Sequence, residues 1–353
     1  MSFKDILGHD REISILKKAI SNNRVAHSFL FAGHEGIGKR LVAISVAKAL
    51  NCSAANKSPS LSPFNKTGCD GSNNDFCGVC QNCKDIEASS YSDVFLIEPR
   101  EPESKGGKID HIAGTIKIDA VRDVQQRLSY RAARGGKKVC IVDCAEKMNK
   151  EAQNAFLKTL EEPPSDSIII LVVSDGGAIL PTITSRCQRI NFTPLPQNVM
   201  LDIVGERLGA AKETAVLLAC LSGGSIGKAL NLDMDTMLEQ RKKIVEVLSR
   251  LSLDDAEGMF KAAEKISKGE RPVESLEFLK IWYRDIAILK EGVEDMVVNS
   301  DLLPVLRQHM ERQTFSRLIS DFQMVLNAQS DIMPPRYANK QLTIENLLMQ
   351  LAT

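Results

Sequence analysis

The chain has 353 residues, 43% of them hydrophobic and 25% charged, a composition typical of a globular protein with two or three domains. Lys+Arg and Asp+Glu each number 45, and this zero net charge argues against a protein held on nucleic acid by bulk positive charge alone. No apolar run reaches the about 20 residues that cross a bilayer, and the first residues lack the apolar core of a signal peptide, so we expect a cytoplasmic protein without membrane contact.

Apolar strands alternate with helices in the first half of the chain. Strands are expected over 28–32, 94–97, 139–143 and 168–173. Helices are expected over 10–20, 41–50, 118–129 and 150–162, the last one ended by two prolines. This alternation predicts a parallel α/β sheet with helices on both faces.

The strand pattern vanishes after about residue 201, so we divide the chain near residue 195 and expect an all-helical second part. Its helices are expected over 212–221, 226–232, 235–251, 254–268, 272–291, 300–309, 312–328 and 339–351. Helical spacing predicts core positions at Leu276, Leu279, Tyr283, Ile286 and Leu289, and also at Phe315, Leu318, Ile319, Phe322 and Leu326.

A glycine-rich turn follows the first expected strand and ends in Gly38-Lys39. Gly33, Gly36 and Gly38 would give the tight backbone that surrounds a phosphate, and Lys39 would reach the β/γ-phosphates of a nucleotide. The next residue should be Ser or Thr, whose hydroxyl binds Mg²⁺, but it is Arg40, which cannot ligate a cation. The alternative is a Gly-rich turn that merely precedes a helix.

A second departure lies at the end of the expected strand 139–143. Asp143 fits the carboxylate that helps to hold Mg²⁺ in ATPases of this kind, but Cys144 stands where an acidic residue polarises the attacking water. Glu146, two residues on, is expected to point elsewhere. Hydrolysis is therefore not expected, and ATP with Mg²⁺ stays open only as a ligand that is bound without turnover.

Five of the nine cysteines fall between positions 52 and 83, beside a Ser/Asn/Pro/Gly-rich insertion at 53–75. In a reducing compartment the spacing of Cys77, Cys80 and Cys83 predicts a structural Zn²⁺ site before a disulfide framework. A fourth thiolate is needed, and both Cys52 and Cys69 are candidates; the alternative is a set of free reduced thiols.

Four segments resemble, in chain order, the bacterial clamp-loader subunits of the AAA+ family: Val25–Phe31, Asn154–Pro164, Ile183–Cys187 and Asn339–Leu348. The resemblance implies an AAA+ P-loop α/β domain over 1–195 with a zinc-binding insertion at about 52–83. It also implies a small helical lid over 196–233 and an all-helical collar domain over 234–353. The family's usual first zinc position corresponds to Cys52, which favours Cys52 over Cys69.

Within that family, Arg40 and Cys144 are similar to the degenerate site of the delta-prime subunits of the DNA polymerase III clamp loader. Gly227 agrees, because the gamma/tau motor subunits carry a nucleotide-sensing Arg at that place. The resemblance implies a stator without ATPase activity of its own, within a DNA polymerase holoenzyme. Its expected partners are the gamma/tau motor subunits and the delta subunit in a five-subunit ring, with the sliding clamp and primed DNA.

The same resemblance makes Arg186 an arginine finger that enters the ATP site of a neighbouring subunit. An arginine is always charged and can donate two hydrogen bonds to phosphate oxygens. The alternative is a surface arginine that caps the sheet or pairs with a nearby carboxylate.

Two other functions compete with the stator hypothesis. An active AAA+ motor subunit, gamma/tau-like or of a helicase loader, predicts Mg²⁺-dependent ATP turnover that Lys39→Ala abolishes. A small-molecule kinase predicts a substrate pocket and needs neither the Arg186 finger nor the cysteine cluster.

Overall fold

The computed structural model describes residues 2–54, 75–99, 114–174, 176–209, 211–251, 255–269, 272–333 and 336–352. The chain divides into two compact units. The first holds residues 1–199 with 225–227, and the second holds residues 200–224 with 228–353. The finer division into domains 1–195, 196–233 and 234–353 stays a prediction.

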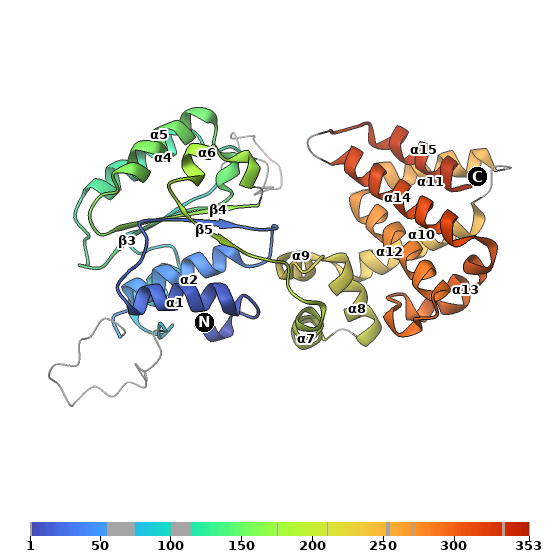
Figure 1. Ribbon diagram of the computed structural model, residues 1–353, viewed down its shortest axis with the longest axis horizontal. Coiled ribbons are helices and arrows are strands. Elements are labelled where there is room, and N and C mark those ends of the chain that lie inside the picture. The colour runs from blue at the N-terminus through green and yellow to red at the C-terminus, as the bar shows by residue number, and fades with distance from the viewer. Residues whose placement is uncertain are drawn as a thin grey trace. The chain divides into compact units, whose positions relative to one another are not determined.

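A five-stranded sheet forms the centre of the first unit (Figure 1). The strands are β1 (Ser28–Ala32), β2 (Val94–Ile97), β3 (Lys138–Val142), β4 (Ser167–Val173) and β5 (Gln188–Asn191). Their order is β2-β3-β4-β1-β5, and every neighbouring pair is parallel. Every residue of β1, β3 and β4 is buried, as expected for central strands covered on both faces. The predicted parallel α/β fold is confirmed.

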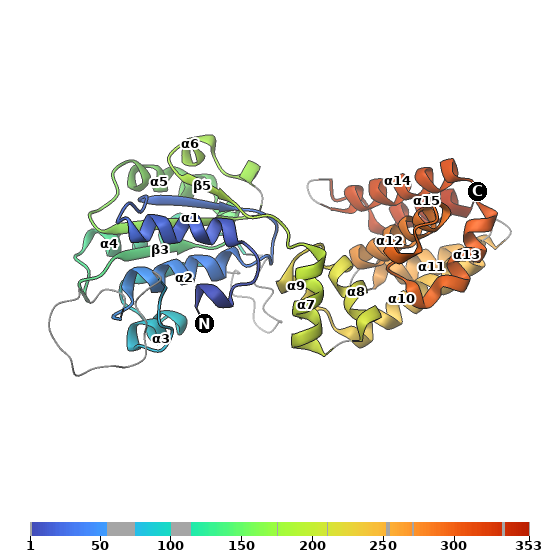
Figure 2. The ribbon, with the colours of Figure 1, turned by 60° about the horizontal axis from the view of Figure 1, so that its bottom comes forward.

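Helices cover both faces of this sheet, because alternate strand residues point to opposite sides. Phe29 and Phe31 pack with α1 (Asp10–Ser21) and α2 (Lys39–Asn51) on one face. Leu30 packs on the other face with α4 (Ile118–Ser129), α5 (Lys150–Glu161) and the short α6 (Pro181–Thr184). Figure 1 shows these three helices on one side of the sheet, opposite α1 and α2. A short helix, α3 (Gln81–Glu87), lies beside α2 (Figure 2). The first unit also holds three 3₁₀ turns, Phe3–Asp5, Ala145–Lys147 and Gly176–Ala178.

Strand β5 and helices α3 and α7 (Gln197–Leu208) were absent from the sequence prediction. In β5 only Ile190 is buried, because the strand lies at the sheet edge and pairs with β1 alone. Its polar sequence, Gln-Arg-Ile-Asn, therefore lacks the apolar run that marks the central strands.

The second unit is helical throughout its described residues. It contains α7 from Met200 onward. Its other helices are α8 (Lys212–Leu221), α9 (Ile226–Asn231, whose first two residues belong to the first unit), α10 (Met234–Arg250), α11 (Ala256–Lys268), α12 (Pro272–Lys290), α13 (Leu303–Arg312), α14 (Phe315–Ile332) and α15 (Lys340–Ala352). Two 3₁₀ turns, Glu294–Met296 and Ser300–Leu302, precede α13. The predicted all-helical second part is confirmed. None of the helices in the described ranges has the length and apolar character to span a bilayer.

Helix α12 is the centre of the second unit and packs against α8, α10, α11, α13 and α14. Its predicted stripe from Leu276 to Leu289 is buried, as expected for a core helix. On α14 the predicted stripe is wrong in part, because Phe315 and Ile319 are exposed. The buried residues of α14 are Leu318, Asp321, Val325, Ala328 and Ile332.

Candidate functional site

The glycine-rich turn lies between the end of β1 and the start of α2, the context that a phosphate-binding loop requires. Gly38 caps the N-terminus of α2 with a φ of 104°, a conformation that favours glycine. A Cβ on Gly33 would lie 2.3 Å from the carbonyl oxygen of Phe192, the residue after β5, so the two backbones are too close for any other residue at position 33. The loop therefore requires glycine at positions 33 and 38, and its role as a phosphate site stays a prediction.

The ammonium group of Lys39 contacts the backbone of the glycine-rich loop. Nζ donates a 2.6 Å hydrogen bond to the carbonyl of Gly33 and a second one to the carbonyl of His34. The side chain is only 5% exposed, and this burial lowers its pKa, against the opposing charges of Glu146 and Asp143. Lys39 therefore has backbone partners without any phosphate.

Arg40 contacts two carboxylates that lie at the C-terminal ends of the parallel strands. Ile97 pairs with Val142, so the residues that follow them, Glu98 and Asp143, emerge side by side. The Arg40 Nη1 atom forms an ion pair with the carboxylate of Glu98 and lies 3.4 Å from Oδ2 of Asp143.

This arrangement does not fit a Mg²⁺ site. Mg²⁺ takes oxygen ligands in near-octahedral geometry, and the position after Lys39 offers a guanidinium in place of a hydroxyl. The positive charge of Arg40 also lies on Asp143, the carboxylate that the cation would need.

Cys144 cannot act as a base beside this carboxylate. Burial, with the charges of Asp143 and Glu146 adding to it, raises the pKa of Cys144 to about 12. The thiol stays protonated at neutral pH. Glu146, expected to point elsewhere, lies near the loop: its Oε1 accepts a 3.1 Å hydrogen bond from the amide of Ser174, and it is the carboxylate that most raises the pKa of Lys39.

The start of α9 touches the loop within the first unit. The amide of Gly227 donates a 2.8 Å hydrogen bond to the carbonyl of Gly36. The resemblance to motor subunits assigned a nucleotide-sensing role to this position, but the backbone contact between Gly227 and Gly36 could not be predicted from the sequence.

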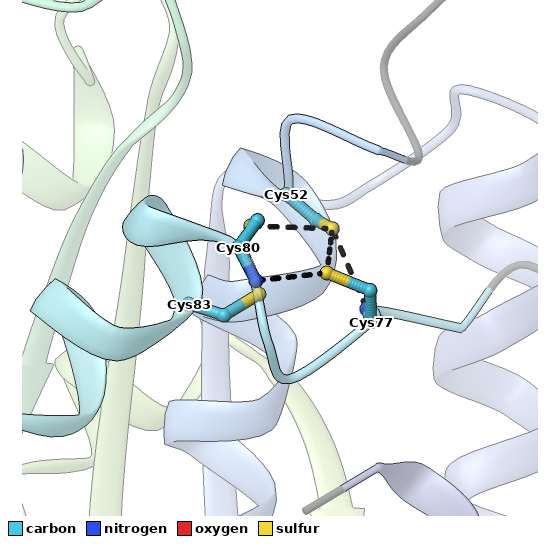
Figure 3. A group of neighbouring side chains, drawn as sticks. All are labelled: Cys52, Cys77, Cys80 and Cys83. Atoms are coloured by element: carbon cyan, nitrogen blue, oxygen red, sulfur yellow. Dashed lines mark hydrogen bonds between the residues drawn. The ribbon is translucent and has the colours of Figure 1, made fainter. Parts of the chain in front are cut away.

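Four thiols come together at the other end of α2. The Sγ atoms of Cys52, Cys77, Cys80 and Cys83 all lie within 4.8 Å of one another (Figure 3). The Cys52 Sγ atom is 3.6 Å from that of Cys77 and 3.9 Å from that of Cys80. Zn–S bonds of about 2.3 Å in a tetrahedron put sulfurs about 3.8 Å apart, so the cluster could hold such an ion. Cys69 lies outside the described residues.

Local structure aims these thiols at one point. Cys52 caps the C-terminus of α2, and Cys80 caps the N-terminus of α3. Gly78 has a φ of 68° and turns the chain between Cys77 and Cys80. The amide of Cys80 donates to Sγ of Cys77 over 3.3 Å, and the amide of Cys77 donates to Sγ of Cys52 over 3.5 Å, contacts that favour thiolate ligands.

Crowding of the four thiols opposes their ionisation in the absence of a cation. The hydrogen bond with Cys52, and then burial, raise the pKa of the Cys83 thiol. Four crowded thiols cannot all ionise alone, and a bound cation would supply the compensating charge.

Polar contacts fasten the cysteine cluster to α2. Lys48 of α2 pairs with Glu87 of α3 over 2.8 Å, and its ammonium group lies 5.5 Å from the centre of the Phe76 ring. The side-chain amide of Asn82 donates a 2.9 Å hydrogen bond to the carbonyl of Asn51, the last residue of α2.

Arg186 follows α6 and lies at the surface. Its Nη1 donates a 2.8 Å hydrogen bond to the carbonyl of Thr182, and its Nη2 lies 2.5 Å from Oε1 of Glu161, the last residue of α5. The side chain remains 36% exposed. Within this chain the guanidinium therefore pairs with a nearby carboxylate.

Two family matches cover most of the chain. Residues 8–196 match the family described as DNA polymerase III, delta subunit, and residues 236–353 match the family of its C-terminal part. The chain belongs to the DNA polymerase III delta subunit family. Two family relatives are named DNA polymerase III subunit delta'. The one from Bacillus subtilis is 26% identical over 97% of this chain and 95% of its own length, and the one from Pseudomonas aeruginosa is 29% identical over 93% and 92%.

The tau subunit of DNA polymerase III from Escherichia coli is 30% identical over 65% of this chain and 32% of its own length. Among solved structures, a gamma subunit-related protein of Thermotoga maritima has a TM-score of 0.39 at 20% identity, covering 96% of this chain and 98% of its own. The Bacillus subtilis DNA clamp loader delta protein has a TM-score of 0.34 at 10% identity, covering 96% and 99%.

Proposed function

We propose that this chain is the delta-prime, or stator, subunit of a bacterial DNA polymerase III clamp loader. In this role it supports the ATP-driven loading of the sliding clamp onto primed DNA without hydrolysing ATP itself. Relatives named delta' match it along nearly their whole length, which supports the family role. The observation that carries the stator role is the contact of Arg40 with Glu98 and Asp143.

The chain's own nucleotide site is proposed to be defective for two separate reasons. The guanidinium of Arg40 competes with Mg²⁺ for Asp143, so the metal that bridges the phosphates has no free place. The protonated thiol of Cys144 cannot orient a water molecule as a carboxylate does. Arg40 acts on the binding of the metal and Cys144 on the activation of water, so either change alone would prevent measurable turnover.

Arg186 is proposed to act in the ATP site of a neighbouring gamma/tau subunit. The pair with Glu161 is half exposed, and such pairs contribute only about 0–1 kcal/mol, so the guanidinium can exchange this carboxylate for phosphate oxygens. An arginine finger supplied by another subunit is worth roughly 10³–10⁵ in rate. The delta subunit would complete the five-subunit ring, with the C-terminal helices as its collar.

The cysteine cluster is proposed to hold one structural Zn²⁺. Four thiolates would fill the tetrahedral sites and leave none for a substrate. The ion would fix α3 against the end of α2.

The ATPase rate of the reconstituted clamp loader tests the finger. Arg186→Ala should leave the chain folded and assembled and lower the rate at that subunit's neighbour by roughly 10³-fold. Arg186→Lys should also be slow, because an ammonium group cannot form the paired hydrogen bonds. Arg189→Ala is the matched control, since Arg189 is a nearby exposed arginine that bonds Asn191, and it should keep the full rate. An assembled Arg186→Ala complex with an unchanged rate would refute the finger.

The likeness to the tau subunit of Escherichia coli supports one alternative, an active motor subunit. The isolated chain would then hydrolyse ATP in the presence of Mg²⁺, and Lys39→Ala would abolish that activity. The stator hypothesis expects no turnover from the isolated chain.

A further inference from the structure

The guanidinium of Arg40 lies against Glu98 and Asp143, where a metal cation would bind. Arg40 therefore does more than replace a hydroxyl that would bind the metal. We propose that its guanidinium is a built-in substitute for the divalent cation, and that it covers a latent site for Mg²⁺ and a nucleoside triphosphate. This inference rests on the proposed loss of the chain's own ATPase site. It adds that binding and hydrolysis are blocked by different residues and can be separated.

Two carboxylates lie at neighbouring positions at the carboxyl edge of the sheet. Parallel pairing of Ile97 with Val142 brings Glu98 and Asp143 to neighbouring positions at the carboxyl edge of the sheet, and the amide of Asp143 bonds the carbonyl of Ile97 over 2.9 Å. Their separation is thus set by the strand register and does not depend on Arg40. Two neighbouring carboxylates repel each other and need a cation close by.

The chain supplies that cation from α2. Arg40 is the second residue of the helix, and its Nη1 atom contacts both carboxylates at once. Burial raises the pKa of Asp143, and Arg40 is the charged group that most opposes this rise. The guanidinium therefore neutralises the pair in the absence of any metal.

The remaining parts of a phosphate site are retained. Gly33, Gly36 and Gly38 have positive φ angles, and α2 starts directly after this loop, the order that a phosphate-binding loop requires. Lys39 bonds loop carbonyls that a phosphate could displace. The Arg40 side chain is 44% exposed, so its removal leaves a position open to water rather than a buried cavity. A threonine there would supply the missing hydroxyl.

The test uses the full-length isolated chain and a fluorescent ATP analogue, with and without Mg²⁺. The wild-type chain should show no Mg²⁺-dependent binding. Arg40→Thr should bind the analogue at least about tenfold more tightly with Mg²⁺ than without, yet show no turnover, because Cys144 is unchanged. Adding Asp143→Asn to Arg40→Thr should remove the dependence on Mg²⁺.

Two controls separate the metal effect from loss of an ion pair. Arg127→Thr removes an arginine that pairs with Asp123 on α4, and it should gain no Mg²⁺ response. Arg40→Met removes the charge without adding a hydroxyl, and its Mg²⁺-dependent gain should be smaller than that of Arg40→Thr.

Folding of the variant gives a second measurement. If Arg40→Thr is poorly folded at low salt, either millimolar Mg²⁺ or the added change Glu98→Gln should restore it, since both relieve the repulsion of the two carboxylates. A folded Arg40→Thr without a Mg²⁺ response overturns the inference, as does an unfolded one that neither treatment restores. All of these results come from the chain without partners, so they are independent of the Arg186 test in the complex.

Discussion

The backbone amide of Gly227 donates a 2.8 Å hydrogen bond to the carbonyl oxygen of Gly36 in the phosphate loop. A Cβ on Gly227 would lie 3.1 Å from both the Cα and the carbonyl oxygen of Gly36. The two backbones thus meet at a distance that only glycine accommodates without movement. The sequence resemblance assigns an arginine to this position in motor subunits, and such a side chain would hold the two segments apart.

Gly227→Ala is expected to destabilise the chain although it lies in a helix. Alanine favours a helix over glycine by about 1 kcal/mol, but here it pushes against Gly36 and weakens a hydrogen bond worth about 1 kcal/mol. Gly205→Ala in α7 is the control, because a Cβ there meets nothing within 4 Å. Urea unfolding should show Gly205→Ala equal to or more stable than wild type and Gly227→Ala less stable. The reverse order would contradict the contact.

Lys39→Met should lower the free energy of unfolding of the isolated chain by about 1–3 kcal/mol. The variant keeps the aliphatic stem but leaves the carbonyls of Gly33 and His34 without their donor. Lys137→Met is the control, since Lys137 forms an exposed pair with Asp166 and its loss should cost about 0.5 kcal/mol or less. Equal stabilities of the two variants in urea would mean that the contacts of Lys39 with the two carbonyls do not stabilise the fold.

Metal content and thermal stability should depend on Cys52 and Cys83. Structural zinc contributes about 10–16 kcal/mol of apparent binding energy, so losing it should lower the melting temperature of the chain by about 10 °C or more. Metal analysis of purified Cys52→Ser and Cys83→Ser should find less than the about one ion expected per wild-type chain.

Two further variants define the ligand set. Cys69→Ser should retain the ion if Cys52 is the fourth ligand. Cys187→Ser is the control, because Cys187 packs against the core on the opposite face of the sheet. Retention of the metal by both Cys52→Ser and Cys69→Ser would rule out a site of four cysteines.

Stability should fall in mild acid because of His309. Burial, and then the charge of Arg312, lower the pKa of His309 below its ordinary value of 6.5, and its Nδ1 accepts a 3.1 Å hydrogen bond from Trp282. As the pH falls through 6.5 the unfolded chain takes up a proton that the folded chain does not. The contribution of His309 is therefore complete above that pH and is lost below it.

Urea unfolding at about pH 7.5 and about pH 5.5 measures this loss. The decrease should be smaller in His309→Gln, which can still accept from Trp282 but does not titrate. An equal decrease in both proteins would exclude His309 as the cause.

The central sheet could be predicted because its strands are continuously apolar. After the first residue, Ser28 in β1 and Ser167 in β4, every position of these strands is apolar because both faces are buried. In β5 only Ile190 is buried, so this strand has no apolar run. On α14, Phe315 and Ile319 have helical spacing but are exposed, since periodicity marks a face without saying which face is covered.

Spacing along the chain predicted only the local parts of the candidate sites, and the assignment of Asp143 and Cys52 needed comparison with known ATPases and clamp loaders. The loop glycines and the Cys77–Cys83 spacing are local patterns. The pairing of Arg40 with Glu98 depends on the register of β2 on β3, and the position of Glu146 near Lys39 depends on the turn after β3. Neither follows from spacing along the sequence.

Helix α2 begins at Lys39 and ends at Asn51, about 20 Å away at 1.5 Å per residue. Its first turn is tied down by electrostatic contacts, and its last residue adjoins the thiol of Cys52. Because both ends of α2 are held, the helix would keep its position if the contacts at one end no longer served a ligand. The proposed loss of nucleotide binding would therefore leave α2 and the adjoining strands aligned, so the domain could serve as a rigid support.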